Sequence, residues 1–91
     1  MEEVYEELVL LFDETGGAHH EAFADTDGYD PEWPLWYSEY MLEQLRSILE
    51  ADFTRSELIY LLISAHNEQT SDAPGSRWKD YFATYFLERY I

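Results

Sequence analysis

Apolar residues recur at steps of three and four along most of the chain, which is the spacing of one face of an α-helix. The first stripe runs from Val4 to Phe23 without a slip in phase, although Gly16 and Gly17 interrupt it. Each glycine costs a helix ~1 kcal/mol relative to alanine. We therefore expect one long helix over 3–24, weakened at the glycines. Two helices that meet at a kink are the alternative.

A second stripe, between Tyr37 and Leu49, predicts a helix over 31–50. Asp30 precedes Pro31 at its start. An aspartate is a favoured N-cap, and proline is favoured at the first helical position because its missing N–H has no partner there. The sequence thus predicts that Asp30 caps this helix.

The third helix has the clearest start. Thr54 and Glu57 stand at the spacing of a capping box, which predicts a helix over 55–70. This segment is apolar around most of its girth, so we expect it to be the most buried helix. A turn-rich linker at 71–75 precedes the last helix, predicted over 76–90.

No alternation of period two, the pattern of a half-buried strand, is present in the sequence. Short connections between successive helices favour antiparallel neighbours. The chain has 91 residues, of which 16 are Trp, Tyr or Phe, and these rings can bury enough apolar area to fold despite the charge. We expect an all-α protein, a compact antiparallel four-helix bundle with one domain over 1–91.

The charge is strongly acidic, with 20 Asp and Glu against 5 Lys and Arg, a formal net charge of −15. Such a field repels phosphate backbones and anionic membranes, so nucleic acid and membrane surfaces are unfavourable partners. Two interpretations stay open: a solvated surface adapted to high salt, or docking to a basic partner. A melting curve against salt separates them, because stability that ignored salt would contradict the high-salt interpretation.

There is no cysteine, which removes disulfides and thiolate metal sites. The longest apolar run, Leu58 to Ile63, is far shorter than a membrane span. The residues after Met1 are acidic where a signal peptide is basic. We expect a cytoplasmic protein.

His19 and His20 are the first candidates for chemistry. Neighbours on a helix point about 100° apart, so both do not easily ligate one ion. The ferritin-like Glu-x-x-His motif is absent, because the positions three before the histidines hold Gly16, Gly17 and Ile63. His19 is in phase with the apolar stripe, which favours a hydrogen-bonded, partly buried histidine. A ligand or proton-transfer role is the second interpretation.

The loop over 25–32 is rich in carboxylates, which hard cations prefer. If Gly28 took the glycine position of an EF-hand, the first and twelfth ligands would be Phe23 and Pro34, which have no side-chain ligand. The EF-hand is therefore excluded. An irregular carboxylate site stays open, but turn chemistry explains most of this pattern without an ion.

Aromatic residues gather at the start of the second predicted helix. Trp33, Trp36, Tyr37 and Tyr40 follow the spacing i, i+3, i+4 and i+7, so they lie on related helix faces. Some of these rings are expected to anchor the helix to the core. Together they also predict an aromatic wall of a pocket or an interface.

The segment His19-His20-x-Ala22-Phe23, followed by Asp27-Gly28-x-Asp30-Pro31-x-Trp33-Pro34-x-Trp36-Tyr37-x-x-Tyr40, resembles a group of short uncharacterised prokaryotic proteins. The resemblance spans about a quarter of the chain. It implies no activity, cofactor or partner.

No phosphate-binding loop, nucleophile elbow or HExxH motif is present, and we predict no cofactor and no resident metal. We expect a small binding or interaction module with a protein or small-molecule partner, or a second copy of itself. The alternative is a small enzyme or metal-dependent protein that uses His19 or His20 with Asp27 or Asp30. The sequence alone does not decide between them.

Overall fold

The structure is a computed structural model that describes residues 2–90, and within them it contains four α-helices and no strand. The predicted all-α four-helix bundle is confirmed. The observed helix ends differ from the predicted ones by at most two residues. The elements are α1 (Glu2–Ala22), the short 3-10 helix η1 (Ala24–Thr26), α2 (Trp33–Leu49), α3 (Arg55–Asp72) and α4 (Trp78–Tyr90).

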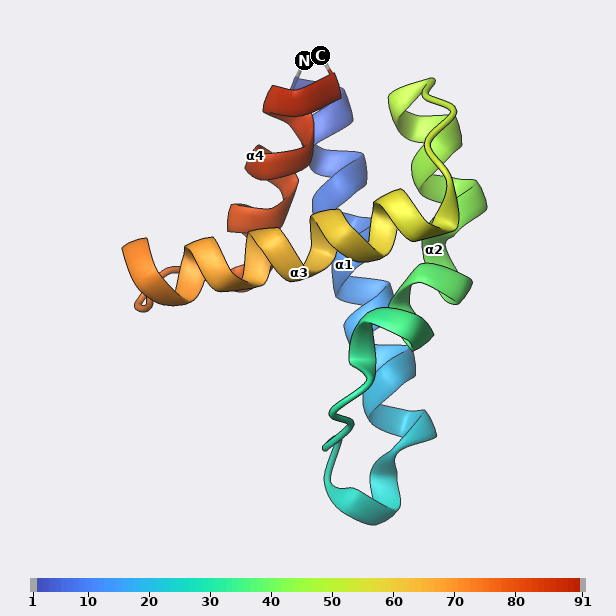
Figure 1. Cartoon of the computed structure of the whole chain (residues 1–91), viewed down its shortest axis with the longest axis vertical. Coiled ribbons are helices and arrows are strands. Elements are labelled where there is room, and N and C mark those ends of the chain that lie inside the picture. The colour runs from blue at the N-terminus through green and yellow to red at the C-terminus, as the bar shows by residue number, and fades with distance from the viewer. Residues whose placement is uncertain (1, 91) are drawn as a thin grey trace.

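The helices pack in a closed ring in which α1 contacts α2 and α4, and α3 contacts the same two helices. Figure 1 shows α2 and α4 running antiparallel to α1, while α3 crosses the bundle at a steep angle. No helix in the described part of the chain has the length and apolarity needed to cross a bilayer.

Phe12 of α1 lies at the centre of the core and is fully buried. Its ring packs against three rings of α4, with centroid distances of 6.2 Å to Trp78, 5.7 Å to Phe82 and 5.8 Å to Phe86. Edge-to-face and tilted pairs of this kind stabilise a core beyond the area they bury. The other fully buried apolar side chains come from all four helices: Leu8, Met41, Leu45, Leu58, Leu62, Ala65, Ala83 and Phe86.

Helix α1 continues through the glycine pair, so the favoured single helix is confirmed and the kinked alternative is wrong. Gly16 faces α4, where a Cβ atom would lie 3.0 Å from Cζ2 of Trp78. Gly17 faces open space. The first glycine therefore lets an indole ring lie against the helix backbone, whereas the second has no such role.

Replacing Gly17 with alanine is expected to raise the free energy of unfolding by about 0.5–1 kcal/mol, because alanine loses less backbone entropy in a helix. Gly16→Ala brings the same gain, but its Cβ meets the Trp78 ring, so we expect that variant to be no more stable than the unaltered protein. Denaturant unfolding of the two variants measures the difference. Equal stabilisation by both would show that Trp78 does not pack on Gly16.

The start of α3 confirms the predicted capping box. The Thr54 hydroxyl accepts a hydrogen bond from the backbone N–H of Glu57 at 3.1 Å, and the Glu57 carboxylate accepts one from the Thr54 N–H at 2.7 Å. The prediction that α3 is the most buried helix is wrong. Tyr60 and Ile63 are 70% and 42% exposed, because α3 crosses the other helices and offers only one face to them.

Candidate functional site

A buried histidine–aspartate pair joins the end of α1 to the loop before α2. His19 Nε2 lies 3.1 Å from Asp30 Oδ2, and the two side chains are only 9% and 10% exposed. The other carboxylate oxygen of Asp30 accepts a hydrogen bond from the Glu32 N–H at 3.0 Å. Asp30 therefore holds the loop in a turn and holds the His19 ring at the same time.

The predicted capping role of Asp30 is wrong. The residue that precedes α2 is Glu32, which makes no capping hydrogen bond through its side chain. Pro34, rather than Pro31, occupies the first turn of the helix, and it is buried. The Asp30 carboxylate accepts instead from the Glu32 N–H within the turn that precedes the helix, and its other oxygen contacts His19.

Three rings enclose His19. The Phe23 ring stacks on the imidazole at 4.8 Å, Trp36 meets it edge-on at 5.1 Å, and Tyr37 lies 5.2 Å away. The interpretation of His19 as a hydrogen-bonded, buried histidine is thus confirmed. The pair fixes the loop to the bundle and orients the start of α2.

His20 and Asp27 do not join this pair, and both are exposed. The His20 ring lies against the backbone of Gly28, where an added Cβ would be 2.7 Å from Nδ1. Asp27 and Gly28 both take left-handed backbone angles, with φ of 56° and 84°, so they make the chain turn after η1. Within residues 2–90, no group of three or more His, Asp or Glu side chains is placed to hold a metal ion.

The predicted aromatic wall divides into two parts. Trp36 stacks on Tyr40 at 5.2 Å, and the Tyr40 hydroxyl donates to Glu14 at 2.9 Å, so these rings turn toward α1. Trp33 lies against His66 of α3, and Tyr37 lies between His19 of α1 and Trp78 of α4. Four residues at helical spacing therefore serve two different surfaces.

Trp33 and Tyr37 form one side of a concave site between α2, α3 and α4, which we call the aromatic pocket. Its volume is about 250 Å³, and its lining residues are Trp33, Tyr37, His66, Gln69, Trp78 and Phe82. This volume lies just below the range typical of sites for drug-sized ligands, so it suits a single side chain or a small head group. His19, His20, Asp27 and Asp30 do not line it.

The rings of the aromatic pocket contact one another in sequence, and each meets the next at a steep angle. Trp33 lies 5.5 Å from His66 and 5.3 Å from Tyr37, with interplanar angles of 63° and 79°. Tyr37 lies 6.1 Å from Trp78 at 61°, and Trp78 lies 5.6 Å from Phe82 at 85°. Each ring of the pocket therefore packs edge to face on the next.

The polar groups of the aromatic pocket are few. The Gln69 amide nitrogen donates to the backbone oxygen of Ser76 at 3.0 Å, which fixes the side chain. Burial raises the pKa of the Tyr37 hydroxyl above its usual value, so the phenol stays neutral at physiological pH. No Asp, Glu, Lys or Arg is among the lining residues.

Four of the lining residues, His66, Gln69, Trp78 and Phe82, were not predicted as site residues. Trp78 and Phe82 stand four residues apart on the apolar face of α4. This spacing is as typical of core residues as of residues that line a pocket. Only the docking of α2 and α4 against the same two helices, α1 and α3, brings these rings to Trp33 and Tyr37.

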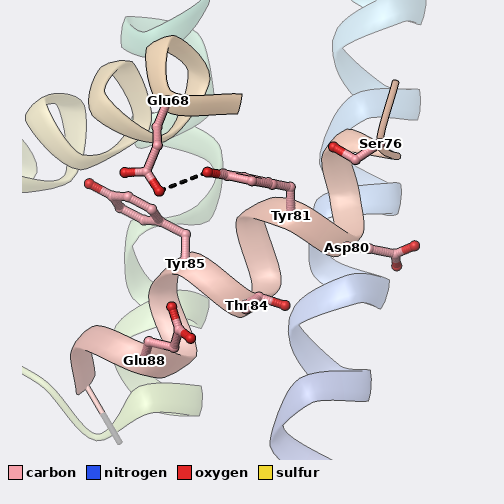
Figure 2. Close-up of a pocket in the computed structure, with 7 residues that line it drawn as sticks. All are labelled: Glu68, Ser76, Asp80, Tyr81, Thr84, Tyr85 and Glu88. Atoms are coloured by element: carbon pink, nitrogen blue, oxygen red, sulfur yellow. Dashed lines mark hydrogen bonds between the residues drawn. The ribbon is translucent and has the colours of Figure 1, made fainter. Parts of the chain in front are cut away.

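A second pocket, of about 310 Å³, lies on the outer side of α4 and α3 and is lined by Glu68, Ser76, Asp80, Tyr81, Thr84, Tyr85 and Glu88. Figure 2 shows the Tyr81 ring directed toward Glu68, with their hydrogen bond dashed, while Asp80 points to the other side of α4. Asp80 also pairs with Arg77 at 3.5 Å. The carboxylates of this acidic pocket therefore diverge instead of meeting at one point.

The hydrogen bond from Tyr81 to Glu68, at 2.7 Å, raises the pKa of Tyr81 to about 12, with burial and neighbouring carboxylates adding to the effect. Glu68→Gln is expected to lower this pKa toward the ordinary 10.0. Because the pKa is raised in the folded state, its stabilising contribution is complete below pH 10.0 and is lost as the pH rises to about 12. Tyrosinate absorbance, with Tyr81→Phe to identify the signal, measures the shift. An unchanged titration in Glu68→Gln would contradict the assignment.

The protein is thus a helical bundle with an aromatic pocket, and the buried histidine–aspartate pair contacts one wall of that pocket, Tyr37. Comparison of the chain with protein-family models, with curated proteins and with solved structures finds no match.

Proposed function

We propose that the protein is a small, non-enzymatic binding module whose aromatic pocket accepts a single side chain or a small head group. The observation that carries this proposal is the pocket of about 250 Å³ with its continuous lining of rings. A concave, mostly apolar site with a few fixed polar groups is the usual form of a small-molecule or anchor site.

The surroundings of the pocket support this use. Trp78 and Phe82 pack on Phe12, and Phe82 is almost fully buried, so the core holds these walls before any ligand arrives. Tyr37 is held from behind by the His19 ring. A site that is rigid before binding loses less conformational entropy when it is occupied.

The alternative, an enzyme that uses His19 with Asp30, has less support. The two side chains are nine-tenths buried, neither lines the aromatic pocket, and the rings of Phe23, Trp36 and Tyr37 surround the imidazole. A general base needs to reach a proton of its substrate, directly or through one water. The pair is better suited to hold the loop.

The three tryptophans provide the test. In an NMR titration with small aromatic, apolar and ammonium compounds at millimolar concentration, we expect the indole N–H signals of Trp33 and Trp78 to shift and saturate. Trp36 packs with Tyr40 outside the aromatic pocket and is the internal control. The absence of any saturable shift, or an equal shift of all three indoles, would refute the proposal.

The proposal includes a cytoplasmic location and either a high-salt surface or a basic partner, as the charge of −15 suggests. Self-association belongs to the same proposal, since Leu10, Leu35 and Ile63 are exposed apolar side chains. Light scattering across a concentration series measures it, and a strict monomer would remove this part.

A further inference from the structure

We infer that the group accepted by the aromatic pocket is a quaternary ammonium, a cation whose nitrogen carries only alkyl substituents. This inference rests on the proposed function and names the ligand chemistry of the same site. It follows from the character of the walls, the scarcity of hydrogen-bonding groups and the charge of the protein.

The walls favour a cation. The face of an aromatic ring is the negative end of its quadrupole, and a cation near several such faces is attracted to each of them. The rings of Trp33, Tyr37, Trp78 and Phe82 all line the aromatic pocket, and successive rings meet edge to face at 61° to 85°. Tryptophan, the strongest partner for cations, supplies two of these four walls.

The hydrogen-bonding groups favour a cation that has no N–H. Gln69 uses its amide nitrogen on Ser76, so the lining offers as acceptors only its carbonyl oxygen, the Tyr37 hydroxyl and the His66 ring. An arginine guanidinium brings five donors, more than these three acceptors pair, and a lysine ammonium needs all three of them in one geometry; each donor left unpaired is costly. A quaternary ammonium has no donor to leave unpaired.

The charges around the pocket are also compatible with a cation. The protein carries a net charge of −15, which raises the concentration of cations near its surface. Lys79 is the positive side chain found beside a pocket ring in the described residues, with Nζ 6.0 Å from the Trp78 centroid. Its charge is balanced by the hydrogen-bonded Asp13 carboxylate.

Choline and its neutral isostere 3,3-dimethylbutan-1-ol have the same shape, so the difference between their affinities measures the contribution of the positive charge. At constant ionic strength, we expect choline to bind about tenfold more tightly than the alcohol. Equal affinity would overturn the quaternary ammonium but leave the proposed binding module intact. No binding of any compound to Trp33 and Trp78 would instead refute the binding module itself.

A charge at His66 tests whether the cation binds in the aromatic pocket. This side chain is exposed on α3, so its substitution is expected to leave the fold intact. His66→Lys adds a positive charge beside Trp33 and is expected to weaken choline about fivefold while leaving the alcohol within about twofold. Gln44→Lys adds the same charge at an exposed position of α2 that does not line the pocket, and it is the control, with both affinities expected within about twofold of the unaltered protein. Choline binding that ignored His66→Lys would mean attraction to the acidic surface, and would overturn the inference.

A quaternary ammonium occurs both in free head groups and in trimethylated lysine side chains. Acetyl-trimethyllysine amide, compared with choline, distinguishes the two sources, and tighter binding of either one identifies the source. Acetyl-lysine amide is the control, and we expect it to bind at least about fivefold more weakly than its trimethylated form. Equal binding of the two lysine compounds would contradict the inference.

Discussion

Phe12→Ala is expected to lower the free energy of unfolding by about 3–5 kcal/mol, the usual cost of removing a buried phenylalanine. The Phe12 side chain is fully buried, and it contacts the rings of Trp78, Phe82 and Phe86. Domains of this size are stable by about 5–15 kcal/mol, so the variant loses a large part of its stability. Two of the three contacting rings also line the aromatic pocket, so ligand affinity is expected to fall with it.

Urea unfolding, followed by circular dichroism, measures the loss. Leu10→Ala is the matched control on the same helix, because Leu10 is 67% exposed and its truncation is expected to change stability by no more than about 0.5 kcal/mol. A loss below about 1 kcal/mol for Phe12→Ala would contradict the central position of this ring.

His19→Ala is expected to cost about 2–4 kcal/mol, because it leaves the Asp30 carboxylate, only 10% exposed, without its imidazole partner. The truncation also removes the ring on which Phe23, Trp36 and Tyr37 pack. The neighbouring His20 is exposed, so His20→Ala is the control and is expected to cost no more than about 0.5 kcal/mol.

A double-mutant cycle isolates the pair from the loss of packing. The combined variant His19→Ala with Asp30→Ala is expected to be more stable than the sum of the single losses predicts, by about 1–2 kcal/mol. Additive losses would show that the 3.1 Å contact between Nε2 and Oδ2 contributes nothing to stability.

The helices could be predicted because their starts and faces depend on residues close together in the chain. Thr54 and Glu57 are three residues apart, and the hydrogen bonds they exchange are complete within one turn. His19 and Leu8 are buried on one face of α1, as the helical period requires. The same period predicts that His19 is buried, whereas its partner Asp30 lies 11 residues further along the chain and is brought to it by the fold.

The structure does not gather the eight candidate site residues in one place. Trp33 and Tyr37 do line a pocket, but Trp36 and Tyr40 face α1, and His20 and Asp27 are exposed. A helical wheel shows which residues share a face, yet it does not show which neighbour that face meets.

The sequence by itself determined the number, type and approximate ends of the helices, the acidic surface and the continuous phase of α1, because each depends on composition or local spacing. The tertiary structure alone decided which residues that are distant in the chain contact one another. It joins Asp30 to His19 and places Trp78 on Gly16. It also turns α3 across the bundle, so that His66 and Gln69 line the same pocket as Trp33. Such contacts depend on how whole helices dock, and docking is set by the summed packing of the core, which no short segment contains.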